Sequence, residues 1–297
     1  MPEGNENQKP TEVVSIQSPW RIFAIEAFLF CLTIGLGIAA TFKINEILKI
    51  KKITPPEISL WQFIFYFLLA TFLLLLILHF VKFQKGKGVI FKILFALSTF
   101  LGGLLFLEAW LPEPAPLILI VFFYFWWWKS PTVLNQDILM ILGMAGVGSV
   151  LGLSLNPEIV AGLLVIFSIY DFIAVYKTKH MVKMAKEMIE SKAILALVIP
   201  PNIFGFQESL GKIRVPAERV GGKFLVLGGG DIVFPLLFSA SLIPVGILNS
   251  LIVAFFSLIG LFVGFYFFTS QKIRQPIPAL PPIAFFSIIG YLITKIL

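Results

Sequence analysis

The chain has 297 residues, of which 58% are hydrophobic and 13% are charged, and its mean hydropathy is +0.96. Soluble domains carry roughly 25% charged residues, so this composition excludes a soluble globular protein and indicates an integral membrane protein. The net charge of +7 does not indicate a nucleic-acid partner, because no basic patch is interleaved with aromatic residues.

Residues 1–19 are polar and lack the cationic start and short apolar core of a signal peptide, so we expect a disordered tail. Nine apolar runs follow, at 20–42, 60–81, 89–110, 115–128, 138–155, 158–176, 224–243, 247–269 and 278–297. The fourth run is short, but it ends in three tryptophans and Lys129, a pattern typical of the membrane interface. A β-barrel would instead alternate polar and apolar residues over segments of about 10 residues. The sequence predicts an all-α membrane protein, a polytopic bundle of nine transmembrane helices.

We expect one membrane domain, with helices 1–5 in residues 20–155 and helices 6–9 in residues 156–297. The segment 177–223 connects helices 6 and 7 and carries nine Lys and Arg. Of the 23 Lys and Arg in the chain, 18 fall on the same side as the N-terminus if nine spans hold. Because cytoplasmic loops are rich in Lys and Arg, the N-terminus and segment 177–223 are predicted to be cytoplasmic and the C-terminus outside. If the fourth run does not span, the N-terminus moves outside but segment 177–223 stays inside.

Two features of segment 177–223 are open to more than one interpretation. Residues 178–192 have the pattern of an amphipathic helix, either in the membrane interface or as a solvated connector. Residues 212–215 alternate like a strand, to which an extended substrate could add.

Asp171 and Asp231 lie in apolar runs, where an ionisable group costs at least a few kcal/mol and is usually retained for function. Asp171 lies six residues before the cytoplasmic end of the sixth helix, and Asp231 lies eight residues into the seventh. At about 1.5 Å per residue, both are roughly 9–12 Å deep. Two carboxylates that meet share one proton, and such a pair can activate water and protonate a carbonyl, as in aspartic proteases. Glu26, in the first helix, is expected to reach the interface or a helical partner instead.

Gly228, Gly229 and Gly230 precede Asp231 directly. They indicate either a loosened turn that lets another backbone approach Asp231 or a plain packing cluster. A metal site is not expected, because His79 and His180 have no third ligand in view and no His pair is spaced four apart beside a Glu. No cofactor fingerprint is present, so we expect no cofactor.

Three short motifs resemble those of one known family. Tyr170-Asp171, Gly228-Gly229-Gly230-Asp231 and Pro278-Ala279-Leu280 lie in the sixth, seventh and ninth apolar runs. In that order they are similar to the motifs of the presenilin and signal-peptide-peptidase family of GxGD intramembrane aspartyl proteases. The details are most similar to an archaeal presenilin homologue.

The resemblance implies that Asp171 and Asp231 are the catalytic pair. It also implies that Tyr170, the three glycines and residues 278–280 position the substrate. The implied substrates are transmembrane proteins cleaved within the lipid bilayer. Segment 177–223 lacks the long loop that presenilin cleaves in its own activation, so accessory subunits are not expected.

The alternative is a transporter or channel that uses paired intramembrane carboxylates to carry protons or cations. Transporters often contain inverted repeats with a broken helix in each half. The first half of this chain has no counterpart of the Gly-Gly-Gly-Asp sequence.

Overall fold

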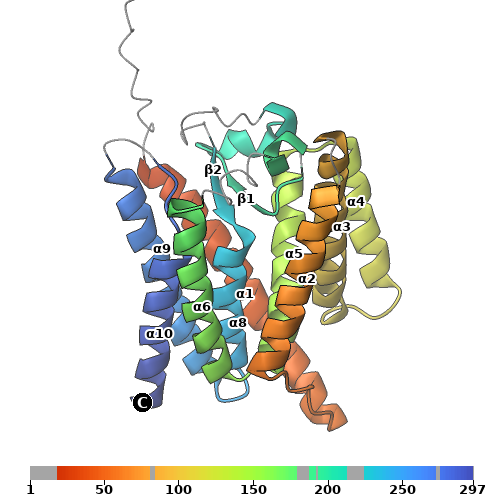
Figure 1. The fold of residues 1–297 in the computed structure, drawn as a ribbon. Helices are drawn as coiled ribbons and strands as arrows, with labels where there is room; N and C mark the ends of the chain where they lie inside the picture. Colours follow the sequence, from red (N-terminus) through yellow and green to blue (C-terminus); the bar gives the residue numbers. More distant parts are fainter. Residues whose placement is uncertain are drawn as a thin grey trace, which may run out of the picture.

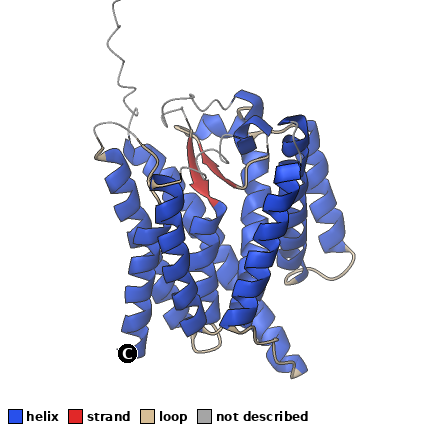
Figure 2. Ribbon diagram, in the orientation of Figure 1, coloured by secondary structure: helices blue, strands red, loops and turns tan. Residues whose placement is uncertain are grey.

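The computed structural model describes residues 19–80, 84–178, 187–191, 193–212, 224–271 and 275–296. It is a bundle of helices that lie side by side, with a small two-stranded sheet at one end (Figures 1 and 2). Three predictions fall mostly outside the described residues: the disordered tail at 1–19, the amphipathic helix at 178–192 and the strand at 212–215. Within them, residues 187–191 are helical, as predicted.

The helices are α1 (Pro19–Lys51), α2 (Leu60–Phe80), α3 (Gln84–Glu108), α4 (Ala115–Lys129), α5 (Val133–Ser154), α6 (Pro157–Tyr176), α8 (Gly229–Ser241), α9 (Ile247–Thr269) and α10 (Leu280–Ile296). Two strands, β1 (Ala196–Ile199) and β2 (Leu225–Gly228), and two 3-10 helices, η1 (Ile203–Gln207) and η2 (Leu210–Lys212), complete the described chain. Within that described part, α1, α3, α5, α6 and α9 are long and apolar enough to cross a membrane, and α2, α4, α8 and α10 are shorter apolar helices. Each corresponds to one of the predicted apolar runs, so the polytopic helical bundle is confirmed.

The seventh apolar run, residues 224–243, is not helical throughout as predicted. Its first part is strand β2, which pairs antiparallel with β1 so that Leu225 lies opposite Ile199 and Gly228 opposite Ala196. The helix α8 begins only at Gly229. A short apolar run fits a buried strand as well as a helix, and here pairing with β1 decides the outcome.

Helix α5 is the central helix of the bundle and packs against α1, α3, α4, α8 and β1. Its glycines allow a close approach of α3. A Cβ on Gly146 would collide with the carbonyl oxygen of Gly102, and a Cβ on Gly143 would lie 2.9 Å from the Cα of Thr99. Small residues let membrane helices pack at backbone contact, and α5 therefore provides a rigid support for the sheet above it.

Candidate active site

Helices α6 and α8 bring Asp171 and Asp231 to the same level of the bundle. The two helices run in opposite directions (Figure 1), and Phe167 of α6 stacks on Phe234 of α8 with ring centroids 4.5 Å apart. Asp171 follows Phe167 by four residues, and Asp231 precedes Phe234 by three. Each aspartate is therefore about one helical turn from the ring stack, on the side of the sheet. The predicted match in depth agrees with this geometry.

The side chain of Asp171 is buried, with 5% of its surface exposed. Its Oδ2 accepts a hydrogen bond of 3.3 Å from the backbone N–H of Leu280. This N–H lies at the start of α10, where the first helical donors have no partner within the helix. A carboxylate at a helix N-terminus is also stabilised by the helix dipole. Asp171 thus joins α6 to the Pro278-Ala279-Leu280 sequence.

Asp231 lies in the first turn of α8 and is partly buried. Asp171 and Asp231 are close enough for their charges to interact. Two carboxylates that come together repel each other when both are ionised, so such a pair can share one proton. The arrangement can supply a general base and a general acid at one point.

The three glycines before Asp231 differ in their surroundings. Gly228 ends β2, and Gly229 and Gly230 begin α8. A Cβ on Gly228 would lie 2.9 Å from Oδ2 of Asp231, and one on Gly229 would lie 3.2 Å from the carbonyl oxygen of Leu195. A Cβ on Gly230 would make only an ordinary contact of 3.7 Å with Phe234. Only the first two glycines are required by space.

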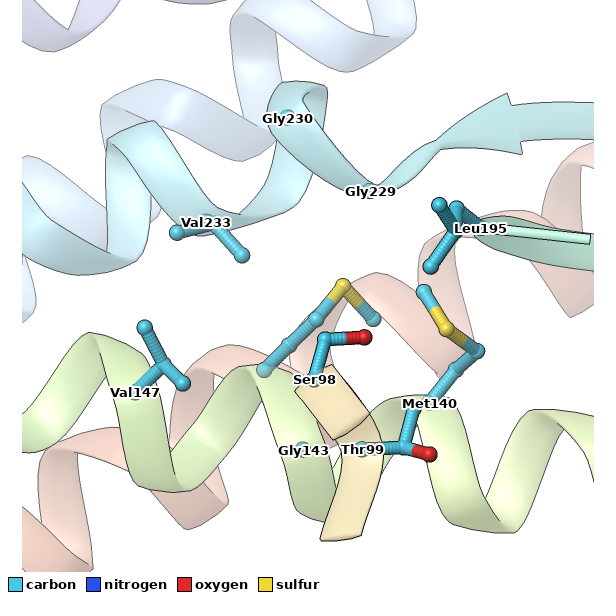
Figure 3. Close-up of a pocket in the computed structure, with 10 residues that line it drawn as sticks. Ser98, Thr99, Met140, Gly143, Val147, Leu195, Gly229, Gly230 and Val233 are labelled. Atoms are coloured by element: carbon cyan, nitrogen blue, oxygen red, sulfur yellow. The ribbon is translucent and has the colours of Figure 1, made fainter. Parts of the chain in front are cut away.

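A cavity of about 250 Å³ borders the turn that carries Asp231. It lies among α3, α5, α8 and the chain before β1, and Figure 3 shows Gly229 and Gly230 along one side of it. Its lining residues are Ser98, Thr99, Met140, Gly143, Met144, Val147, Leu195, Gly229, Gly230 and Val233. The cavity therefore lies directly beside the beginning of α8.

The other residues predicted for the site lie at two different places. Pro278 is buried and precedes α10, Ala279 packs against the hydrophobic core, and Leu280 is 4% exposed beside Asp171. Tyr170 is instead 53% exposed, on an outer face of α6. Among the described residues, its hydroxyl has no hydrogen bond to either aspartate.

The expectation that Glu26 extends to the membrane interface is wrong. Glu26 is 5% exposed, and its Oε2 has no hydrogen-bond partner among the described residues. Gly37 lies eleven residues later, which is three helical turns, and it faces Leu236 of α8. Glu26 therefore lies on the α1 face that is turned toward α8, the helix that carries Asp231. The spacing to Gly37 was the signal that could have shown this.

Besides Asp171 and Asp231, the chain has one more aspartate, Asp137, which was not predicted as a site residue. Hydropathy places the start of the fifth span at residue 138, whereas α5 begins at Val133 and includes Asp137. Asp137 is 1% exposed, and its Oδ1 accepts a hydrogen bond of 2.9 Å from the N–H of Val198 in β1. A carboxylate near the beginning of an apolar helix was the available signal.

Two solved structures resemble this one over most of its length. Both are described as structures of a presenilin family intramembrane aspartate protease, one in space group C222 and one in P2. The first is 24% identical with a TM-score of 0.61 and covers 93% of this chain and 98% of its own. The second is 22% identical with a TM-score of 0.53 and covers 91% and 96%. These likenesses show the fold.

The comparison with curated proteins found no match. The family described as "Signal-peptide peptidase, presenilin aspartyl protease" matches residues 25–297, which is nearly the whole chain and includes Asp171, Asp231 and residues 278–280. The resemblance inferred from the three motifs is thereby confirmed, and the chain belongs to the signal-peptide peptidase and presenilin family of aspartyl proteases.

Proposed function

We propose that Asp171 and Asp231 are the catalytic dyad with which this intramembrane aspartyl protease hydrolyses peptide bonds inside transmembrane segments of other proteins. The observation that carries the proposal is their common level above the Phe167–Phe234 stack, with Asp171 bonded to Leu280. Members of the family act on membrane proteins, and no observation favours the transporter alternative.

The reaction needs one ionised and one protonated carboxylate. The ionised group removes a proton from a water molecule while the oxygen of that water attacks the peptide carbonyl carbon. The protonated group gives its proton to the carbonyl oxygen, which yields a neutral tetrahedral diol. When the diol collapses, the C–N bond breaks, the departing nitrogen takes a proton from one carboxyl group of the dyad, and a diol hydroxyl gives its proton back to the dyad. The pair ends with one proton again, so no metal, cofactor or covalent intermediate is required.

The sequence Gly228-Gly229-Gly230-Asp231 fits the Gly-x-Gly-Asp pattern of the GxGD proteases, and we assign the enzyme to that type. Gly228 leaves space for the Asp231 carboxylate, and the N–H of Leu280 orients Asp171. Pro278 and Ala279 hold the start of α10 beside the dyad. Tyr170 is assigned to the outer side of α6, where a substrate helix would approach.

Strand β2 is the proposed docking site for the unwound substrate. The N–H of Gly229 donates to the carbonyl of Leu195 at 3.3 Å, which makes that pair a hydrogen-bonded one. Because such pairs alternate along an antiparallel ladder, the backbone groups of Val226 and Gly228 point away from β1. An extended peptide can add there as a third strand, and Gly228 is three residues from Asp231. The substrate strand predicted at 212–215 lies mostly outside the described residues and stays a prediction.

The orientation follows from charge. The sheet and both aspartates lie toward the end of the bundle from which segment 177–223 projects, so this end is assigned to the cytoplasm, as is the N-terminus. Water then reaches the dyad from the cytoplasm, and the C-terminus lies outside. We also propose that one chain in a lipid bilayer is sufficient, without accessory subunits.

The test uses purified protein in lipid vesicles with a single-span model substrate. We expect cleavage that an aspartyl-protease transition-state analogue blocks and that either Asp171→Asn or Asp231→Asn abolishes. Glu158→Gln is the matched control, because Glu158 is a carboxylate at the opposite end of α6, bonded to Tyr291 and Lys295. Full turnover by either dyad variant, or equal loss in the control, contradicts the assignment.

A further inference from the structure

The outer edge of β1 is occupied by two side chains from the first turns of α5. Nε2 of Gln136 donates to the carbonyl oxygen of Ile194 at 2.5 Å, and Oδ1 of Asp137 accepts from the N–H of Val198 at 2.9 Å. Gln136 is 0% exposed and Asp137 is 1% exposed. Both bonds join residues about sixty positions apart in the chain, so they fix the strand to the central helix.

These are the backbone groups that another strand would use. Leu195 pairs with Gly229 through a hydrogen bond, and the direction of the backbone groups alternates from one residue of a strand to the next. The backbone groups of Ile194 and Val198 therefore point away from β2. Gln136 and Asp137 therefore take the place of a neighbouring strand along this edge. All four residues of β1 are buried, whereas three of the four residues of β2 are only partly buried.

The chain that follows β1 also returns to α5. The N–H of Val133 donates to Glu208 at 3.1 Å, and the N–H of Leu210 donates to Pro131 at 3.0 Å. Val133 and Val198 lie in one buried hydrophobic cluster between the helix and the strand. The side of the sheet that faces α5 is thus closed by polar and apolar contacts together.

This closure is obtained at a cost in stability. Oδ2 of Asp137 and Oε1 of Gln136 are buried without a hydrogen-bond partner among the described residues. An unpartnered buried polar atom destabilises the folded state, so stability alone does not account for a carboxylate and an amide at this place. A role in holding the strand accounts for both.

We propose that Gln136 and Asp137 are positioning residues that close the outer edge of β1, so that a substrate strand adds only to β2 and in one register relative to Asp231. The inference rests on the proposed addition of substrate at β2. Without the contacts of Gln136 and Asp137, β1 and β2 shift against α5, and more than one peptide bond of the substrate can then reach the dyad.

The experiment measures KM, kcat and the cleavage position of the single-span substrate, the last by mass spectrometry of the products. Asp137→Ala removes the acceptor for the Val198 N–H, and Asp137→Asn keeps an acceptor oxygen. We expect Asp137→Ala to raise KM about tenfold, since a buried hydrogen bond that positions the strand is lost, and to spread cleavage over neighbouring bonds. Asp137→Asn should restore the single cleavage position.

Asn135→Ala is the matched control. Asn135 is a buried polar residue of the same helical turn, but its Nδ2 donates to Ser130 rather than to β1. It should leave the cleavage position unchanged. The proposal is overturned if Asp137→Ala cleaves at the wild-type bond with unchanged KM, or if Asn135→Ala gives the same spread. If Asp137→Ala does not fold, Gln136→Met, which loses the bond to Ile194, is judged by the same criteria.

A second readout separates this inference from the protease assignment. Amide hydrogen exchange at Val198 should be faster in Asp137→Ala than in Asp137→Asn or Asn135→Ala, whether or not substrate is cleaved. If exchange rises but the wild-type protein cleaves nothing, the contact is real and the proposed function fails. If cleavage proceeds and exchange at Val198 is unchanged, the proposed positioning role fails.

Discussion

At the scale of single residues, the space around one atom separates the three glycines that precede Asp231. A methyl group on Gly228 would press on the carboxylate of Asp231 at 2.9 Å, whereas one on Gly230 would lie 3.7 Å from Phe234. The first distance requires something to move, and the second is an ordinary contact. Because Gly230 is exposed as well, we expect the motif to tolerate a larger side chain at Gly230 better than at Gly228.

We therefore expect Gly228→Ala to reduce kcat at least tenfold by displacing the Asp231 carboxylate, since small misplacements of a catalytic group are costly. Gly230→Ala should keep cleavage within about threefold of wild type, because alanine also favours the helix that begins here. Initial rates on the same substrate measure both variants. Equal losses in the two would show that backbone freedom, rather than space, governs this turn.

Glu26 provides a second test at this scale. Its buried oxygen lacks a partner among the described residues, and the residue lies on the α1 face turned toward α8. Replacement by Leu removes the unpartnered oxygen while keeping similar bulk, and we expect the protein to gain about 1–3 kcal/mol of stability. Thermal unfolding in detergent, with Thr33→Val on the same face of α1 as a control, measures the gain. A lower unfolding temperature for Glu26→Leu would show that the carboxyl group is stabilised by its surroundings.

At the scale of elements, the sheet is the part of the active site that hydropathy cannot predict. Apart from Asp231 and its glycines, residues 224–243 form one apolar run, and hydropathy does not distinguish β2 from the helix that follows it. The pairing partner β1 lies about thirty residues earlier in a segment that hydropathy assigns to the cytoplasm. Only the three-dimensional contact between the two, supported by α5, makes the first part of the run a strand.

Proline substitutions along β2 test which of its edges receives substrate. The N–H of Val226 points away from β1, so Val226→Pro should keep the pairing of β1 with β2 but reduce cleavage of the model substrate at least tenfold. The N–H of Leu227 points toward Leu197, so Leu227→Pro should disrupt the pairing of β1 with β2 itself. Cleavage assays together with hydrogen exchange of β1 distinguish the two. Undiminished cleavage by a folded Val226→Pro protein would exclude strand addition at this position.

At the scale of the whole molecule, charge bias predicts which end of the bundle faces the cytoplasm. Ile203 lies near the sheet and Val245 lies in the turn between α8 and α9 at the opposite end, and both are exposed. In a Cys31→Ser background, we expect Ile203→Cys to react with an impermeant thiol reagent only from the cytoplasmic side. Val245→Cys should react only from outside, and the reverse pattern would invert the assigned orientation.

The sequence predicted the helical bundle and the aspartate pair because both follow from strong energetic terms. Long apolar runs must form helices in lipid, and an acid such as Asp171 is costly there unless it has a function. The inward turn of Glu26 was not predictable from hydropathy, since α1 is apolar on all sides and its buried face is set by its neighbours. Asp137 was missed because a helix start is uncertain by a few residues.

The stacked rings of Phe167 and Phe234 have a consequence for the cell. Two acids below the surface of a membrane form part of a path for protons, and a path that crossed the whole membrane would dissipate the ion gradient. The rings lie one turn beyond the acids, and Leu163, Leu164 and Leu237 are buried around them. These side chains offer no group that can relay a proton, so a proton path through the two acids would end at the rings, and peptide hydrolysis at the dyad need not let protons cross the membrane.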